Sequence, residues 1–274
     1  MKIFYLYGRS CSGKDSIIER MIDERSIRVI TSLQPKDNDT RPCLIPTYTS
    51  REARESDNSL ITIHKDININ GTGEDRFVDT QYFDSVKRND ELTNISILAI
   101  SNDNLDRISR YSRLTGDETI PILKEHDNFL IVGDLPQYRG EKQTKCFILL
   151  SKYKKIENGE LKEVYYARYF TNKNDVFLVG DTKMLRLLED YDKDIVYSIS
   201  LLCEDKVLLK RALDRDGDVD EIIRRYLDDK KVFNYTSKAD VFHSIILFTD
   251  IMSSKQCADV ITAFIHLVNN PEKY

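Results

Sequence analysis

Several patterns are missing from this sequence, and each absence removes a class of function. No stretch approaches the roughly 18 consecutive apolar residues of a membrane-spanning helix. The 46 acidic residues outnumber the 41 lysines and arginines, so no overall positive charge would recruit nucleic acid. The N-terminal residues lack the charged, apolar and small-residue regions of a signal peptide. We therefore expect a cytoplasmic protein that binds neither membranes nor nucleic acid.

Cysteine and histidine are too scattered for a disulfide framework or a metal centre. The five cysteines are widely spaced, and no two of them form a Cys-x-x-Cys pair, which is typical of reduced thiols without structural zinc. The four histidines share no ligand spacing, so solvated or core roles are expected for them. Neither a Ser-His-Asp nor a Cys-His arrangement can be argued from the sequence.

The most informative stretch lies near the N-terminus, where an apolar segment, a loop with glycine at each end and an amphipathic helical pattern (residues 15–24) follow one another. Gly8 and Gly13 would let the backbone curve closely around an anion. The loop amides, the positive helix end and Lys14 would then face the phosphates of a nucleotide, as in P-loop enzymes. The alternative is an ordinary glycine turn that leads into a helix. The residues expected to bind the phosphates of ATP are Gly8, Ser10, Cys11, Ser12, Gly13, Lys14, Asp15 and Ser16.

The residue after this lysine departs from the usual loop. Asp15 stands where a serine or threonine ordinarily holds Mg²⁺. A carboxylate is a hard oxygen ligand that can bind Mg²⁺ directly or through water. Asp15 is therefore a candidate metal ligand.

A second pattern suits a phosphate monoester. Arg51 and Arg54 are three residues apart and are framed by hydroxyl side chains. Guanidinium groups bind the phosphate oxygens in pairs, and the hydroxyls can satisfy the remaining acceptors. Taken alone, this stretch would be interpreted as an exposed charged loop.

Together the two stretches resemble the guanylate kinases, whose second signature is Thr-Thr-Arg-x-x-Arg. Thr49-Ser50-Arg51 and Arg54 match that signature, and residues 159–163 and 168–171 are similar to two later elements of the family. The loop ending in Gly-Lys-Asp also resembles related nucleotide kinases, including the ribose 1,5-bisphosphate phosphokinases. The resemblance implies that Mg²⁺ is held by Asp15 and Asp181. The acceptor-binding residues that it implies are Arg51, Arg54, Glu163, Tyr169, Thr171 and Asp181.

Basic residues also bracket a turn in the last third of the chain. Two apolar-periodic segments flank an Asp-Gly-Asp sequence at residues 216–218, which resembles the lid of the same family. A flap of two helices can carry arginines over the phosphates, exclude water and balance the transferring charge. The alternative is two solvated helices. The cations expected to act in catalysis are Lys14, Arg211, Arg215, Arg224 and Arg225.

Apolar strands that alternate with helices predict a three-layer α/β fold with a parallel central sheet. The resemblance specifies a P-loop kinase fold, with a nucleotide-binding core at residues 1–48 and 174–274 and a lid at about 211–227. Residues 49–173 would form an enlarged acceptor-binding region with an insertion. The strands expected from apolar runs are 27–31, 94–100, 128–133, 145–150, 176–180, 195–201 and 243–248.

These observations favour ATP- and Mg²⁺-dependent phosphoryl transfer to a nucleoside monophosphate, with GMP or dGMP as the expected acceptor. One alternative keeps the ATP site and changes the acceptor to another small phosphate ester, such as a ribose bisphosphate or a modified deoxynucleotide. A second alternative is a non-catalytic binding module of the guanylate-kinase type. The sequence leaves the oligomeric state open, a homodimer included.

Overall fold

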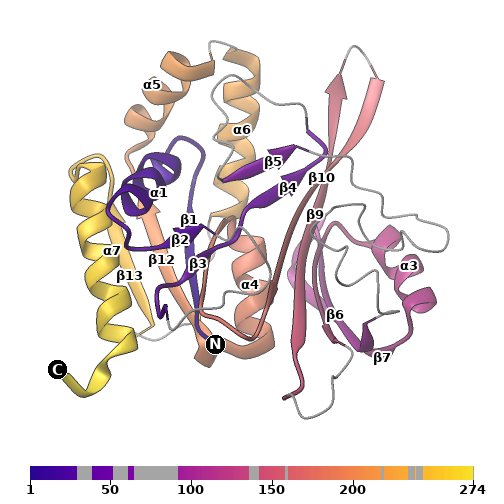
Figure 1. Ribbon diagram of the computed structural model, residues 1–274. Helices are drawn as coiled ribbons and strands as arrows, with labels where there is room; N and C mark the ends of the chain where they lie inside the picture. Colours follow the sequence, from indigo (N-terminus) through magenta and orange to yellow (C-terminus); the bar gives the residue numbers. More distant parts are fainter. Residues whose placement is uncertain are drawn as a thin grey trace. The chain divides into compact units, whose positions relative to one another are not determined.

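The computed structural model describes residues 1–29, 39–51, 61–64, 92–135, 142–157, 160–216, 219–233, 238 and 243–273. The chain divides into two compact units, each built on one β-sheet (Figure 1). Unit 1 comprises Met1–Val29, Asn38–Leu44 and Asp175–Tyr274. Unit 2 comprises Ile30–Asp37 and Ile45–Asn174. None of the helices in the described ranges combines the length and hydropathy that a membrane crossing requires.

The sheet of unit 1 is parallel, with the strand order β13-β12-β1-β11-β3-β2. Its strands are β1 (Ile3–Gly8), β2 (Arg28–Val29), β3 (Cys43–Leu44), β11 (Val176–Gly180), β12 (Val196–Leu202) and β13 (Ser244–Phe248). All of β1 is buried, as expected for a central strand of a parallel sheet that is covered on both faces. The expected α/β class with a parallel sheet is therefore observed.

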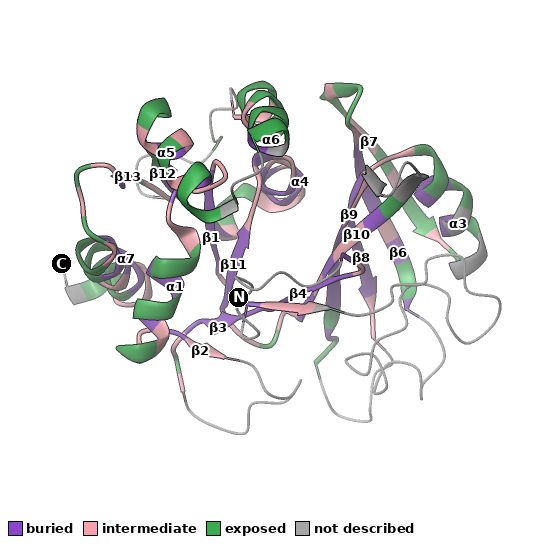
Figure 2. Ribbon diagram, turned by 90° about the horizontal axis from the view of Figure 1, so that it is seen from above, coloured by how far each residue is buried: buried purple, intermediate pink, exposed green. Residues whose placement is uncertain are grey.

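Helices cover both faces of this sheet. The helices of unit 1 are α1 (Lys14–Asp23), α4 (Thr182–Asp192), α5 (Asp205–Asp216), α6 (Val219–Val232) and α7 (Ser254–Asn269), with short 3₁₀ turns at Lys193–Ile195 and Pro271–Lys273. Figure 2 shows α1 and α7 on one side of β1 and β11, and α4 on the other. Helix α1 buries Ile17, Ile18 and Met21, the apolar stripe that its sequence predicts.

The parallel topology brings the carboxyl ends of the strands to one edge of the sheet. β1 lies between β11 and β12, with Tyr7 beside Gly180 and Gly8 beside Leu201. The segments that follow these three strands therefore begin close together. In open α/β sheets, ligands bind at this edge.

Unit 2 is built on a mainly antiparallel sheet, with the order β5-β4-β10-β9-β8-β6-β7. The pairing of β4 with β5 is parallel, and the other pairings are antiparallel. Its elements are β4 (Thr47–Thr49), β5 (Thr62–His64), β6 (Thr93–Ser101), β7 (Asn104–Leu114), α3 (Gly116–Glu125), β8 (Asn128–Asp134), β9 (Lys145–Glu157) and β10 (Glu160–Thr171).

An apolar cluster forms the core of unit 2. Strands β6, β8, β9 and β10 supply most of it, and Ile122 and Leu123 of α3 pack into it. The segment between residues 100 and 128, for which the sequence analysis predicts no strand, forms β7 and α3. Strand β7 lies at one edge of the sheet and is mostly exposed, which explains why its apolar pattern is weak.

Candidate phosphate-binding site

The loop between β1 and α1 depends on its two glycines. A Cβ atom at Gly8 would lie 2.6 Å from the Ser12 hydroxyl oxygen and 2.9 Å from Leu201 Cβ, so only glycine fits there. Gly13 precedes α1 with a φ of 92°, in the left-handed region that favours glycine. Close packing therefore requires glycine at position 8, and backbone conformation favours glycine at position 13.

Lys14 turns its ammonium group back into this loop. Its Nζ donates hydrogen bonds to the carbonyl oxygens of Gly8 at 2.6 Å and Arg9 at 2.9 Å. Burial is the largest influence on this group and lowers the pKa of Lys14, and the charge of Arg215 lowers it further, whereas nearby negative groups oppose the shift. The ammonium group is thus held at the first turn of α1, beside the loop amides.

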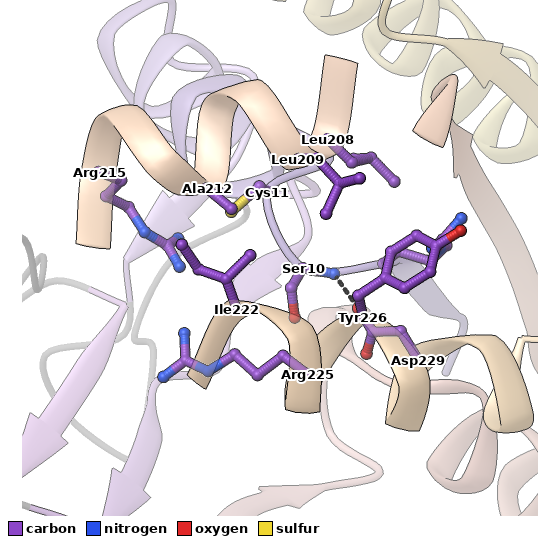
Figure 3. A pocket seen from close by; sticks show the side chains of 11 residues that line it. Ser10, Cys11, Leu208, Leu209, Ala212, Arg215, Ile222, Arg225, Tyr226 and Asp229 are labelled. Carbon is purple, nitrogen blue, oxygen red and sulfur yellow. Dashed lines mark hydrogen bonds between the residues drawn. The ribbon is translucent and has the colours of Figure 1, made fainter. Parts of the chain in front are cut away.

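A backbone N–H of the loop already donates to an anion. The amide of Ser10 donates a hydrogen bond to Oδ2 of Asp229 at 2.6 Å, drawn as a dashed line in Figure 3. Asp229 lies on α6, two residues beyond the lid predicted at about 211–227. The contact shows that this loop can accommodate a negatively charged oxygen at an amide.

Arg9 is a residue of this site that the sequence reasoning missed. Its guanidinium forms an ion pair with Asp205 at the start of α5 and lies 4.8 Å from the centre of the Tyr226 ring. The Tyr226 hydroxyl donates to the same carboxylate at 2.5 Å. The Tyr226 hydroxyl, first, and the Arg9 guanidinium hold the pKa of Asp205 below its usual value. Its position between the two loop glycines is the sequence feature that could have identified Arg9 as a site residue.

Arg211 braces the loop rather than facing the cavity beside it. Its Nη2 donates to the carbonyl oxygen of Thr249 at 2.6 Å, and its Nη1 lies 3.4 Å from the carbonyl oxygen of Cys11. Thr249 directly follows β13, so Arg211 ties the loop to the far edge strand of the sheet. This predicted catalytic cation is not among the residues that line the cavity.

The other three predicted cations divide into two groups. Arg215 and Arg225 line a cavity between the loop, α5 and α6, and Figure 3 shows their side chains entering the same space. Arg224 is exposed, pairs with Asp228 at 2.8 Å and is not among the residues that line this cavity. Helical geometry explains the difference, because neighbouring positions point about 100° apart.

The two predicted metal ligands are placed differently. Asp15 is exposed in the first turn of α1, next to Lys14. Asp181 caps α4, and its Oδ1 accepts hydrogen bonds from the amides of Lys183 at 3.0 Å and Met184 at 3.1 Å. Within the described ranges, no group of three or more potential metal-ligating side chains occurs. Ser16, the remaining predicted loop residue, is exposed.

The predicted acceptor-binding residues lie mainly in unit 2. Arg51 follows β4 and is only 8% exposed, with its amide donating to the Thr49 hydroxyl at 3.1 Å. Ser50 is hydrogen-bonded to the backbone of Tyr165 on β10, and the Tyr165 hydroxyl donates to Glu163. Arg51 therefore directly follows a residue, Ser50, that is hydrogen-bonded to β10 near Glu163. Arg54 lies outside the described residues.

Tyr169 and Thr171 belong to the other end of the same strand. Residues Glu163 and Tyr169 are six positions apart on β10, which separates them by about 20 Å at the usual strand rise. Tyr169 is 1% exposed, and its ring packs 5.6 Å from that of Tyr48 in the core. Burial raises the pKa of Tyr169 well above its usual value. In this structure Glu163 and Tyr169 therefore lie towards opposite ends of β10.

The site and the sheet thus define an α/β protein with a glycine-bounded loop at the carboxyl edge of its parallel strands. No protein-family model matches the sequence, and no curated protein matches it. Among solved structures, the chain is similar to the crystal structure of guanylate kinase from Anaplasma phagocytophilum, at 11% identity and a TM-score of 0.35. That alignment covers 97% of this chain and 85% of the other. The loop geometry, rather than this overlap, carries the functional argument.

Proposed function

We propose that the protein is an ATP-dependent phosphotransferase, with a nucleoside monophosphate such as GMP or dGMP as the acceptor. The observation that carries the proposal is the loop of Gly8 to Lys14, whose Ser10 amide already donates to a carboxylate. Such a loop beside a helix N-terminus offers amide donors, a positive dipole end and a lysine to a polyphosphate. The likeness of this stretch to P-loop enzymes, noted in the sequence, supports the same conclusion.

Each basic side chain near the loop has a distinct proposed task. Lys14 would move from the loop carbonyls that now accept its hydrogen bonds to the β- and γ-phosphates of a bound nucleotide. Arg215 and Arg225, which line the cavity, would balance charge on the transferring phosphoryl group. Phosphoryl transfer depends mainly on such positioning and charge neutralisation, so no nucleophilic side chain is required.

Asp15 fits a Mg²⁺ ion better than Asp181 does. Mg²⁺ is ordinarily held by one or two carboxylates together with substrate phosphates and water. Asp15 is exposed beside Lys14, whereas one carboxylate oxygen of Asp181 is engaged in capping α4. When bound, Mg²⁺ would neutralise charge on the phosphate oxygens. We propose Asp15 as the ligand of Mg²⁺ and Asp181 chiefly as the cap of α4.

Arg51 is the best candidate to bind the phosphate of the acceptor. The residues proposed to contact the acceptor's base favour keeping a second candidate function. The separation of Glu163 from Tyr169 along β10 speaks against a single guanine pocket made from both. This observation favours keeping a small phosphate ester, such as a ribose bisphosphate, as an alternative acceptor. Arg51 would serve either acceptor, because its guanidinium recognises the phosphate and not the base.

The first test removes the loop lysine. Lys14→Ala should lower ADP formation by roughly 10²- to 10³-fold, the usual loss when one donor to developing charge is removed. Lys206→Ala is the matched control, because Lys206 lies in the same unit with its side chain 80% exposed. Full turnover in the Lys14→Ala protein would show that the loop does not act in phosphoryl transfer.

The second test identifies the acceptor. Coupled ADP release should be measured with Mg²⁺ across GMP, dGMP, other nucleoside monophosphates and sugar phosphates. Arg51→Lys keeps the charge but loses the forked donor geometry, so we expect a raised KM for the true acceptor with little change in the KM for ATP. ATP binding without turnover on any acceptor would instead favour the non-catalytic binding module.

A further inference from the structure

One side chain of α6 lies where an anionic ligand of the loop would be expected. Oδ2 of Asp229 accepts the hydrogen bond from the Ser10 amide (Figure 3). Amides near a helix N-terminus are the donors that phosphate oxygens use in anion-binding loops. The protein's own carboxylate therefore occupies a donor that the proposed ligand needs.

A second contact from α6 reaches the neighbouring loop residue. Tyr226 lies three residues before Asp229, so both side chains project from one face of the helix. The Tyr226 ring lies against the guanidinium of Arg9, and its hydroxyl donates to Asp205, the ion-pair partner of Arg9. Helix α6 thus holds two consecutive residues of the loop, at positions 9 and 10.

The cavity between the loop, α5 and α6 is small. It has a volume of about 20 Å³, enough for about one water molecule. A triphosphate needs far more room. For a polyphosphate to enter this cavity, helix α6 would have to move away from the loop.

The contact with α6 also leaves donors of Arg9 unused. Its Nε and Nη2 atoms are buried and have no hydrogen-bond partner within the described part of the chain. A buried donor without a partner is destabilising, and charged donors are especially so. An oxyanion that entered beside Ser10 could satisfy these donors, which is a second sign that an anion is the natural occupant of this space.

We propose that Asp229 is an internal substitute for a phosphate group, which holds α6 against the loop until a polyphosphate displaces it. This inference rests on the proposed function, because it names the ligand class of the same loop. Competition between Asp229 and the ligand lowers the affinity of the wild-type protein. A charge-assisted hydrogen bond is strong enough to account for about tenfold in a dissociation constant.

The test compares two neighbouring carboxylates. Asp229→Asn removes the charge with little change of shape, and Asp228→Asn makes the same change at an exposed residue that pairs with Arg224. Binding of inorganic tripolyphosphate and of ADP is measured by calorimetry. We expect Asp229→Asn to bind both about tenfold more tightly than wild type, and Asp228→Asn to match wild type.

Amide hydrogen exchange supplies a readout that affinity alone does not. In the ligand-free wild-type protein, the Ser10 amide should be protected, and Asp229→Asn should increase its exchange. Tripolyphosphate should protect Ser10 in both proteins while it increases exchange in α6 of the wild type. If Asp229→Asn does not fold, Tyr226→Phe loosens the same contact through Asp205 and should tighten binding by a smaller factor.

The outcomes separate this inference from the proposed function. Unchanged or weaker ligand binding in Asp229→Asn, with normal binding by wild type, would overturn the role of Asp229 and leave the phosphotransferase proposal standing. Failure of both wild type and Asp229→Asn to bind any nucleotide or tripolyphosphate would overturn both. Tighter binding in Asp228→Asn as well would show a general charge effect and overturn the specific role of Asp229.

Discussion

The two units of this protein place their polar side chains in different ways. In unit 1 the strands are parallel, so the segments after β1, β11 and β12 meet at one edge and bring Lys14, Asp181 and Asp205 to the same side of the sheet. In unit 2 the residues predicted to bind an acceptor lie largely along one strand, β10, where each residue adds about 3.4 Å. Parallel topology therefore gathers residues that are distant in sequence, whereas one strand of an antiparallel sheet separates residues that are close in sequence.

The largest expected effect comes from core substitutions, which test whether the two units unfold independently of each other. Phe177 on β11 and Phe129 on β8 are both fully buried, one in each unit. Truncation of either to alanine should lower the free energy of unfolding by about 3–5 kcal/mol, because it removes apolar contacts and leaves a cavity. Amide hydrogen exchange should rise in β1 and β12 for Phe177→Ala, and in β6 and β9 for Phe129→Ala.

Equal loosening of both sheets by either substitution would contradict this division. Leu267→Ala is a suitable control, since this residue is 44% exposed on α7 and should change stability much less.

A smaller effect is expected from two helix caps. Ser253 accepts a hydrogen bond from the Gln256 amide at the start of α7, so Ser253→Ala should cost about 1 kcal/mol in unit 1. Thr115, before α3 in unit 2, donates its hydroxyl to Glu118, and the Thr115 amide donates to the same carboxylate. Thr115 makes no side-chain cap hydrogen bond to a helix amide, so Thr115→Ala should destabilise less.

Chemical denaturation with exchange readouts for α7 and α3 would measure both cap effects. A greater loss for Thr115→Ala than for Ser253→Ala would be inconsistent with these bonding patterns.

The smallest effect concerns the ion pair between Arg9 and Asp205. The pKa of Asp205 is lowered in the folded protein, so its contribution to stability is present above its ordinary pKa of about 3.9 and is lost as the pH falls through the lower folded value. The Asp205 side chain is 48% exposed, so solvent screens the pair and the contribution should be only about 0–1 kcal/mol.

Thermal unfolding of wild type and Asp205→Asn, followed between pH 3 and 7, would measure this contribution. The two stabilities should differ slightly at pH 7 and converge at the acid end. A difference that grows as the pH falls would contradict the assigned sign.

Local sequence patterns predicted the buried strands, which are apolar runs in the sequence, and the loop between the two glycines. The apolar run at 176–180 matches β11 to the residue, and β8 and β12 lie within one residue of the predicted bounds. The glycine spacing predicted the loop, because Gly8 and Gly13 are required there by packing and backbone conformation. Edge strand β7 and helix α3 were missed, since the first is mostly exposed and the second contains Pro121.

Contacts between distant parts of the chain could not be predicted in the same way. Asp229 and Ser10 are 219 residues apart, and nothing in the local sequence around either pairs one carboxylate with one amide. Arg224 and Arg225 are adjacent and chemically identical, yet only Arg225 lines the cavity. The orientation of α6, which is a tertiary property, decides between them.

The position of β1 within its sheet has a consequence for synthesis of the protein. β1 and its loop leave the ribosome before β11 and β12, which are the two neighbours of β1 in the sheet. Arg211 and Thr249, which brace the loop, emerge later still. β1 consequently acquires its final shape only after β11 and β12 have been made, and the nascent chain must keep this apolar strand from aggregating until then.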